Sequence, residues 1–247
     1  MTVFEIDLYL ISDTKLLILG FAKDMIGNQK LSKNITKEKQ DIEARHALVG
    51  PADIWESKRA FQFNFLIDRL LKKDHYLLDI GCGTLRGGIP LIEYLDKGHY
   101  FGIEARDYVL NEGKKELSEA GLELKQPTLL HSPDIAQLNF DFKFDYIWSF
   151  AVLIHMTDEI LDDTLKLVSE YLSDLGVMYA NVNIGTSRTG NWQEFPVMWR
   201  PLSFYEDVCV RNGLTVKSLG SLKQFGHVVI GDQSQEDKIM LQIKKKV

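Results

Sequence analysis

Cysteine is nearly absent from this sequence of 247 residues, which contains only Cys82 and Cys209. Two cysteines are too few for a disulfide framework, a cysteine-rich metal site or a thiolate trap, and their scarcity favours a reducing compartment. No compact set of carboxylates suggests a magnesium site either. We therefore expect a cytoplasmic protein without a bound metal.

An excess of positive charge is also lacking. The 29 lysines and arginines stand against 35 aspartates and glutamates, which gives a formal net charge of −6. Proteins that hold nucleic acid through its phosphates usually carry an overall basic charge or a basic stripe. The balance disfavours a nucleic-acid substrate.

Long hydrophobic runs are missing as well. The apolar run Leu16 to Ala22 is flanked by charges and is far shorter than a membrane span, so we expect no stable membrane insertion. The run also lacks the basic start and the cleavage pattern of a signal peptide. The wider stretch "LYLISDTKLLILGFA" is apolar enough either to form a homodimer through N-terminal helices or to dock on a membrane surface, and the sequence leaves both open.

The chain divides into two regions by pattern. Residues 1–73 are predicted to be helical, with a polar break between Gly27 and Lys39, and to form a cap, lid or oligomerisation segment. In residues 74–247 short apolar strands alternate with amphipathic helices, which is typical of a mostly parallel sheet covered on both faces. The predicted strands are Tyr76–Ile80, Tyr100–Glu104, Thr128–His131, Asp145–Phe150 and Val177–Val182, and the predicted helices are Gly88–Leu95, Asp107–Ala120 and Asp158–Ser173.

The end of the chain departs from this alternation. The letters "SFYE" at Ser203 to Glu206 are typical of a capping box that opens a helix. Two strands follow, at Thr215–Leu219 and Lys238–Ile243, without a long helix between them. The predicted fold class is therefore α/β, a doubly wound, mostly parallel seven-stranded sheet with an antiparallel edge hairpin and a helical N-terminal cap.

The stretch "LLDIGCGTLRGG" at Leu77 to Gly88 carries the strongest functional signal. It begins as a buried strand and then places four glycines in eight residues, as a backbone that approaches a ligand closely requires. A second acid, Glu104, ends the next strand at the position where a carboxylate accepts hydrogen bonds from ribose hydroxyls. A dinucleotide or S-adenosylmethionine would use such a turn, but Asp79 would repel a pyrophosphate and would attract the cations of S-adenosylmethionine.

The sequence resembles the class I S-adenosylmethionine-dependent methyltransferases. The resemblance lies in "LLDIGCGT" at Leu77, "YFGIEA" at Tyr100, "FDYIWSFAVLIHM" at Phe144 and "GVMYANV" at Gly176. It implies a Rossmann-like fold, S-adenosylmethionine as the methyl donor and S-adenosylhomocysteine as the product. Two alternatives stay open: an NAD(P)-dependent oxidoreductase, and a non-catalytic S-adenosylmethionine-binding or interaction domain.

The resemblance also implies which residues hold the cofactor. It places Asp79, Gly81, Cys82 and Gly83 around the methionine part, Glu104 and Ala105 at the ribose, Asp134 and Ile135 at the adenine, and Ser149 and Phe150 beside the cofactor. Other roles are open for the three acids. Asp79 would cap the glycine turn, Glu104 would pair with a neighbouring cation, and Asp134 would cap a turn.

The acceptor is expected beside the fourth strand, where His155 has the proton affinity of a general base at neutral pH. The insertion at 185–205 is expected to cover it, and the candidate substrate-binding residues are Arg86, Trp192, Glu194, Trp199 and Arg200. The chain lacks the Asn/Asp-Pro-Pro-Tyr/Phe loop of enzymes that methylate bases or glutamine, and the paired glutamates of arginine methyltransferases. We therefore expect a small molecule, a sugar or a peptide-derived metabolite as the acceptor, with oxygen favoured over nitrogen as the nucleophile and both left open.

Overall fold

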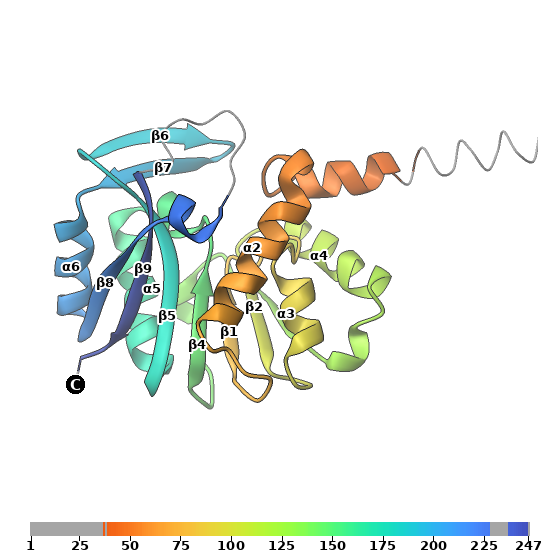
Figure 1. Cartoon of the computed structure of the whole chain (residues 1–247), viewed down its shortest axis with the longest axis horizontal. Helices are drawn as coiled ribbons and strands as arrows, with labels where there is room; N and C mark the ends of the chain where they lie inside the picture. The colour runs from red at the N-terminus through yellow and green to blue at the C-terminus, as the bar shows by residue number, and fades with distance from the viewer. Residues whose placement is uncertain (1–36, 38, 228–236, 247) are drawn as a thin grey trace, which may run out of the picture. The chain divides into compact units, whose positions relative to one another are not determined.

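The computed structural model describes residues 37, 39–227 and 237–246 (Figure 1). The chain divides into two compact units, Met1–Arg45 and His46–Val247. In the first unit, residues 37 and 39–45 are helical. The predicted dimer or membrane contact of "LYLISDTKLLILGFA" lies outside the described residues. All elements named below belong to the second unit.

A central sheet of seven strands forms the core of the second unit. Five parallel strands lie in the order β3-β2-β1-β4-β5, β9 pairs antiparallel with β5, and β8 pairs antiparallel with β9. This confirms the mostly parallel sheet with an antiparallel edge hairpin. The strands are β1 (Leu77–Ile80), β2 (Tyr100–Glu104), β3 (Thr128–His131), β4 (Phe144–Ser149), β5 (Leu172–Ile184), β8 (Leu214–Ser221) and β9 (Lys238–Lys245).

Two further strands extend this sheet in the predicted insertion. β6 (Arg188–Trp192) and β7 (Phe195–Arg200) form an antiparallel hairpin that turns at Gln193, whose φ is 52°. β7 pairs with the last residues of β5, with Asn183 opposite Trp199. The hairpin therefore projects beyond the carboxyl end of β5 (Figure 1).

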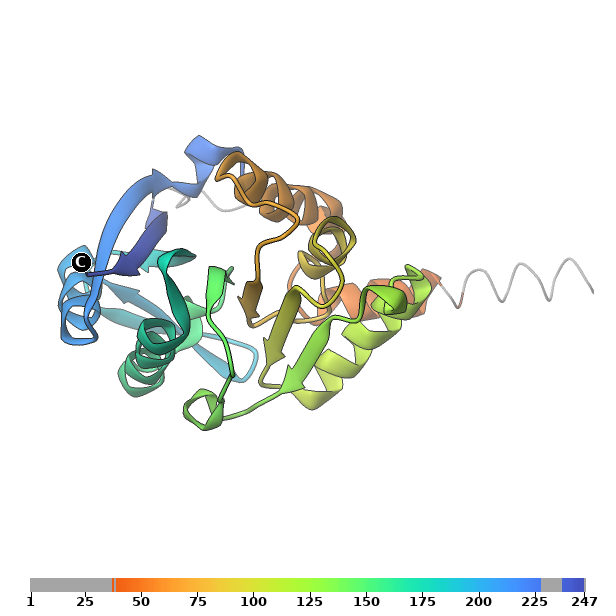
Figure 2. The ribbon, with the colours of Figure 1, turned by 90° about the horizontal axis from the view of Figure 1, so that it is seen from below.

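Helices cover both faces of the sheet. On one face lie α2 (Trp55–Asp68), α3 (Gly88–Tyr94) and α4 (Asp107–Glu119), and on the other lie α5 (Asp158–Tyr171) and α6 (Leu202–Arg211). Figure 2 shows α2 and α3 on the opposite side of the sheet from α5 and α6. Short 3₁₀ turns connect the elements: η1 (Ala52–Ile54), η2 (Glu123–Lys125), η3 (Ile135–Gln137), η4 (Leu153–His155) and η5 (Leu222–Phe225).

A hydrophobic core lies on each face of the sheet. The strands contribute side chains to both cores, because successive side chains of a strand point to opposite faces. In β4, Tyr146 and Trp148 pack with α2 and α3, whereas Ile147 between them packs with α5 and α6. The short buried strands can therefore be apolar throughout, which the sequence shows at β1 and β4.

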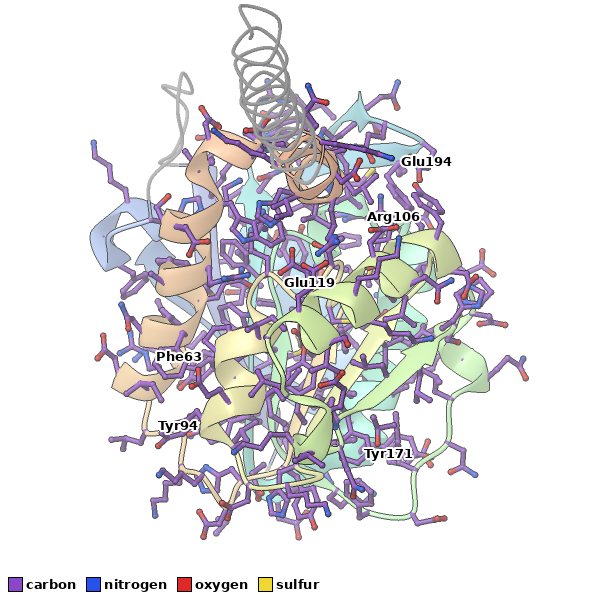
Figure 3. The ribbon with its side chains drawn as sticks, turned by 90° about the vertical axis from the view of Figure 1, so that its right-hand side faces the viewer. Phe63, Tyr94, Arg106, Glu119, Tyr171 and Glu194 are labelled. Atoms are coloured by element: carbon purple, nitrogen blue, oxygen red, sulfur yellow. The ribbon has the colours of Figure 1, made fainter. Side chains whose placement is uncertain are left out.

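Helix α2 is part of the main unit. Its predicted apolar face, Trp55, Phe61, Phe65 and Leu66, is buried. The ring of Phe65 meets Trp148 with centroids 5.6 Å apart, and Phe63 meets Tyr94 of α3 at 5.8 Å (Figure 3). The boundary between the two compact units thus lies after Arg45. The sequence pattern had placed residues 1–73 together in one helical segment.

The predicted helix starts were right for α5 and wrong for α6. The Thr157 hydroxyl caps α5 by accepting a hydrogen bond of 3.4 Å from Ile160 N. Helix α6 begins at Leu202 behind Pro201, and no side chain caps it, so Ser203 lies inside the helix and not at a capping box. The fixed φ of Pro201 ends the preceding strand, and this places the helix start before Ser203.

Within the described part of the chain, no helix combines the length and the apolar character needed to cross a bilayer.

Candidate active site

The glycine turn after β1 holds its shape through two backbone hydrogen bonds. Gly81 N and Cys82 N donate to the carbonyl of Ile103 at 2.8 and 2.9 Å. Gly81 has φ +77°, and a Cβ there would lie 2.3 Å from Val152 Cγ2. Only glycine leaves this backbone open toward a ligand.

A cavity of about 630 Å³ lies at the carboxyl ends of the parallel strands, next to this turn. This volume is typical of a site for a cofactor or small ligand. The cavity brings together most of the predicted site residues. Those that line it are Asp79, Gly81, Cys82, Gly83, Arg86, Glu104, Ala105, Asp134, Ile135, Phe150, His155, Trp192 and Trp199.

Asp79 is a buried acid with one hydrogen-bond donor. Its side chain is 4% exposed, and Tyr100 Oη donates to its Oδ2 at 2.6 Å. Burial raises the pKa of Asp79 to about 7; the Tyr100 hydrogen bond opposes the shift and the nearby Glu104 adds to it. A cationic ligand beside Asp79 would replace the hydration that this carboxylate has lost.

Glu104 holds the glycine turn from the end of β2. Its Oε2 accepts from Gly83 N at 3.0 Å, and its Oε1 accepts from Arg106 N and Arg106 Nε, both at 3.1 Å. The pairing with a neighbouring cation, left open by the sequence, is therefore present. A carboxylate oxygen has two lone pairs, so these bonds leave acceptor capacity for a ribose hydroxyl.

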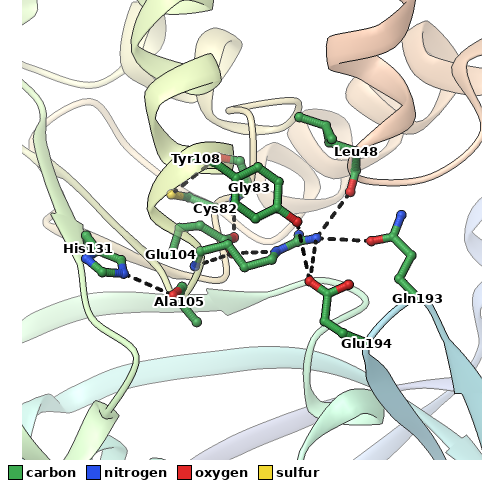
Figure 4. Close-up of polar contacts among 10 residues, drawn as sticks. Leu48, Cys82, Gly83, Glu104, Ala105, Tyr108, His131, Gln193 and Glu194 are labelled. Atoms are coloured by element: carbon green, nitrogen blue, oxygen red, sulfur yellow. Dashed lines mark hydrogen bonds and ion pairs between the residues drawn. The ribbon is translucent and has the colours of Figure 1, made fainter.

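Arg106 extends this contact to two other segments (Figure 4). Its Nη1 donates to Leu48 O at 3.4 Å and to Gln193 Oε1 at 3.2 Å, and lies 3.9 Å from Glu194 Oε1. Arg106 thereby joins the end of β2 to the β6–β7 turn.

Cys82 and Asp134 have local roles in addition to lining the cavity. Burial, and then the nearby Asp79 and Glu104, raise the pKa of the Cys82 thiol well above its usual value, so it stays protonated. Asp134 Oδ1 accepts from Ala136 N at 3.0 Å and caps η3, one of the roles that the sequence left open.

His155, the last residue of η4, lines the cavity and contacts the β6–β7 hairpin. Its Nδ1 lies 2.8 Å from the carbonyl oxygen of Pro196, and its ring centroid lies 5.4 Å from that of Trp192. A carbonyl only accepts, so Nδ1 carries the proton and Nε2 carries the lone pair. Burial lowers the pKa of His155, so the ring is neutral at pH 7.

Three predicted site residues do not line the cavity. Ser149 is fully buried, and its Oγ donates to Ile80 O at 3.2 Å. Glu194 lies at the hairpin turn, where Tyr108 Oη donates to its Oε1 at 3.3 Å. Arg200 is 3% exposed and donates through Nη2 to Asp158 Oδ1 at 2.6 Å and to Met156 O at 2.8 Å, so it ties β7 to the start of α5.

Several lining residues escaped the sequence analysis. Asn181 and Asn183 on β5 are 2% and 1% exposed, and Asn181 Oδ1 accepts from Ala151 N at 2.6 Å. Two asparagines at alternate positions of a buried strand are an unusual pattern, which gives a signal readable in "YANVNI". Lys58 and Gln62 reach the cavity from α2, a non-local approach that no local motif reveals.

The residues present fit S-adenosylmethionine. Gly81 and Gly83 expose backbone at a point where a Cβ would collide with the opposite wall, Asp79 offers a buried anion, and Glu104 lies one crossover away. This combination suits a zwitterionic ribonucleoside that carries a positive sulfur, rather than a pyrophosphate.

Comparison with known proteins agrees with the geometry. Residues 78–178 match a family model described as a methyltransferase domain. A curated relative, an uncharacterised protein of Rickettsia prowazekii (strain Madrid E), is 27% identical over 111 residues, which is 43% of this chain and 42% of that protein. This chain thus matches less than half of that relative's length.

Solved structures share the fold at low sequence identity. An S-adenosylmethionine-dependent methyltransferase from Clostridium acetobutylicum ATCC 824 has a TM-score of 0.58 at 16% identity, covering 76% of this chain and 91% of that one. Magnesium protoporphyrin IX methyltransferase from Synechocystis PCC 6803 with bound S-adenosylmethionine has a TM-score of 0.57 at 15% identity, covering 84% and 83%. A glycopeptide N-methyltransferase in complex with S-adenosylmethionine has a TM-score of 0.58 at 13% identity, covering 74% and 92%.

These findings decide against the oxidoreductase alternative. The matched family model describes a methyltransferase domain, and a solved structure with the same fold contains bound S-adenosylmethionine. The buried acid Asp79 lies where it would repel a pyrophosphate. Residues 78–178 thus match a methyltransferase domain, and the unit that contains them has the fold of solved S-adenosylmethionine-dependent methyltransferases.

Proposed function

We propose that the methyl acceptor is a small molecule, a sugar or a peptide-derived metabolite, and that methylation takes place on oxygen. The observation that carries this proposal is the part of the cavity wall where His155, Trp192 and Phe195 lie together. Aromatic rings and a single neutral imidazole suit a small organic acceptor with one hydroxyl to deprotonate.

His155 is the proposed general base. S-adenosylmethionine supplies an electrophilic methyl group, so the protein has to orient a nucleophile toward it and accept the proton that a hydroxyl loses. The Pro196 carbonyl fixes the tautomer with Nε2 unprotonated, and the lowered pKa keeps that nitrogen free to accept a proton at pH 7. The Pro196 contact thus positions the base as well as joining it to the hairpin.

The size of the site supports a small acceptor. The cavity of about 630 Å³ has to hold the cofactor as well, and the β6–β7 hairpin supplies part of its wall. Among proteins with this fold, one is named for magnesium protoporphyrin IX and another for a glycopeptide. The cytoplasmic location and a homodimer through the N-terminal helices stay predictions from the sequence.

The test is a screen with S-adenosylmethionine labelled on its methyl group, against libraries of small hydroxylated metabolites, sugars and short peptides. The proposal expects label transfer to an oxygen of one class. His155→Asn should lower kcat about 10²- to 10⁴-fold while the dissociation constant of S-adenosylhomocysteine changes little. His99→Asn, on the loop before β2, is the control and should keep full activity.

Cofactor binding without transfer to any acceptor would favour the non-catalytic binding domain instead. Transfer to nitrogen, with His155→Asn retaining activity, would contradict the assignment of the base.

A further inference from the structure

Three basic side chains and one histidine gather in one part of the cavity, in a protein whose net charge is −6. They are Lys58 of α2, Arg86 of the glycine turn, His227 after η5 and Lys238 at the start of β9. The buried acid Asp79 lies close enough to Arg86 for its charge to raise the pKa of the guanidinium. We refer to these four residues as the cationic cluster.

Arg86 is 7% exposed, yet it is incompletely bonded. Its Nη1 donates to Val49 O at 3.0 Å, and its guanidinium lies 5.6 Å from the Trp55 ring centroid. Its Nε is buried and has no hydrogen-bond partner in the part of the chain that the structure describes. Burial lowers the pKa of Arg86 to about 10, with a further contribution from Arg59. A buried guanidinium with an unused donor normally faces an anion.

Lys58 lies next to Arg86. A Cβ placed on Gly50 would be 3.6 Å from Arg86 Nη1 and 3.7 Å from Lys58 Nζ, so the two cationic groups flank the same point. Burial, and then repulsion from Arg86 and Lys238, lower the pKa of Lys58 to about 8, which only Asp53 opposes. Two like charges held this close in a half-buried site are destabilising until an anion joins them.

His227 completes the cluster from the other side. It is 6% exposed, and neither of its buried ring nitrogens has a hydrogen-bond partner among the described residues. Burial, and then Lys58, Lys238 and Arg86, lower the pKa of His227 to about 4, so the ring is neutral at pH 7. Its ring packs edge-on against Phe61 and Phe150, at centroid distances of 4.9 and 5.4 Å. Such a ring offers one donor and one acceptor to a ligand in the cavity.

The cluster extends away from the cofactor end of the cavity. Lys238 starts β9 and pairs with Asn183 of β5, and β9 lies three strand positions from β1, which is roughly 14 Å. S-adenosylmethionine has a single carboxylate, and one basic group is enough to neutralise its charge. Arg86 next to the glycine turn is close enough for it, which leaves the remaining basic groups for a second anion.

We propose that the part of the cationic cluster beyond Arg86, namely Lys58, His227 and Lys238, binds an anionic oxygen group of the acceptor, a carboxylate or a phosphate. This inference rests on the proposed function, because it identifies a chemical class within the acceptors considered there. The acceptor then lies with its anionic end between α2 and the start of β9, and with its nucleophile toward His155.

The experiment measures anion binding by calorimetry to the full chain saturated with S-adenosylhomocysteine, whose carboxylate already fills the cofactor end. The probes are inorganic phosphate and malonate, at constant ionic strength set with chloride. Both Lys58→Gln and Lys238→Gln should weaken probe binding about tenfold, which corresponds to about 1.4 kcal/mol. Lys72→Gln, an exposed lysine, is the matched control and should bind the probes as the parent does.

Lys58→Gln should leave S-adenosylhomocysteine affinity within about twofold of the parent, because Lys58 faces the second anion. If phosphate and malonate bind the free protein but not the S-adenosylhomocysteine complex, the cluster serves only the cofactor carboxylate and the inference is wrong. If S-adenosylhomocysteine does not bind, the proposed function fails separately, and probe binding to the free protein that is lost in Lys58→Gln still supports the anion site.

Discussion

The Tyr100 hydroxyl donates a hydrogen bond of 2.6 Å to Asp79 Oδ2, between two neighbouring parallel strands and inside the core. Tyr100 is itself buried, and burial, followed by the charge of Asp79, raises the pKa of the phenol well above its usual value. The phenol therefore stays protonated around neutral pH, and Asp79 is the group of this pair that titrates there.

Cofactor affinity should depend on pH through Asp79. Because its pKa is raised from 3.8 to about 7 in the free protein, Asp79 is mostly protonated below pH 7, and a ligand ammonium has to displace that proton. Between about pH 5.5 and 7 the affinity for S-adenosylhomocysteine should rise by up to about tenfold per pH unit. Calorimetry in buffers of different ionisation enthalpy should detect proton release. Asp79→Asn should bind weakly, with an affinity that does not change over this range.

The same linkage sets the stability of the free protein. A carboxyl with a raised pKa contributes stability below pH 4, which is lost as the pH rises through 7. S-adenosylhomocysteine should therefore raise the melting temperature more at pH 8 than at pH 6. A melting shift that is equal at both values would contradict the role given to Asp79.

Tyr100→Phe should move the pH profile upward. Loss of the hydrogen bond that lowers the pKa of Asp79 leaves the carboxyl harder to ionise, so affinity at pH 7 should fall about 3- to 10-fold and recover at higher pH. Tyr94→Phe is the control, because the Tyr94 hydroxyl bonds to Leu71 O at 3.1 Å and does not line the cavity. Equal losses in both variants would mean that the effect is general destabilisation.

Gly81→Ala should reduce stability and cofactor binding by more than the strain of its positive φ alone predicts. Gly81 and Gly98 have nearly the same φ, +77° and +78°, but a Cβ on Gly98 meets nothing within 4 Å, whereas one on Gly81 collides with Val152. Gly98→Ala should cost about 1 kcal/mol of the free energy of unfolding, from backbone conformation. Gly81→Ala should cost about 1–3 kcal/mol more and should weaken S-adenosylhomocysteine binding at least tenfold. Denaturant unfolding and calorimetry measure the two effects, and similar values for the two alanines would contradict the close approach at Gly81.

Arg106→Gln should loosen the β6–β7 hairpin. Arg106 joins Glu104 to Gln193 and Glu194, so its loss removes the polar contacts between β2 and the hairpin turn (Figure 4). Amide hydrogen exchange in residues 188–200 should become faster, while exchange in β1 and β4 should not change. Arg69→Gln, whose guanidinium lies over Phe65 and Phe225, is the control and should leave the hairpin protected. Unchanged exchange in Arg106→Gln would show that the pairing of β7 with β5 and the contacts of Tyr108 and His155 hold the hairpin without Arg106.

The sequence was sufficient to predict the sheet because its strands are short, apolar and bounded by turns. The bounds Tyr100–Glu104 and Thr128–His131 coincide with β2 and β3, and the end hairpin lies where the two closing strands were expected. The β6–β7 hairpin was not predicted, because its turn at Gln193 lacks the Asn-Gly or Asp-Gly signal and Pro196 lies inside a strand.

The site was predictable where it is local in sequence. The glycine turn and the acids that end β1 and β2 follow from one crossover, so their positions at the cavity could be inferred from spacing. The cationic cluster could not, because Lys58, Arg86 and His227 meet only after α2 and η5 pack on the same face of the sheet. Arg200 was expected at the substrate and instead pairs with Asp158, a partner 42 residues away that no sequence pattern indicates.

We expect the cavity lined by Asp79 and Glu104 to hold S-adenosylmethionine, and the whole account depends on this. Calorimetry with purified protein, comparing S-adenosylhomocysteine with NAD, tests it most directly. We predict one S-adenosylhomocysteine bound per chain, affinity reduced at least tenfold in both Asp79→Asn and Glu104→Gln, and no heat from NAD. Binding of NAD in place of S-adenosylhomocysteine, or equal affinity in the parent and in both variants, would contradict the account.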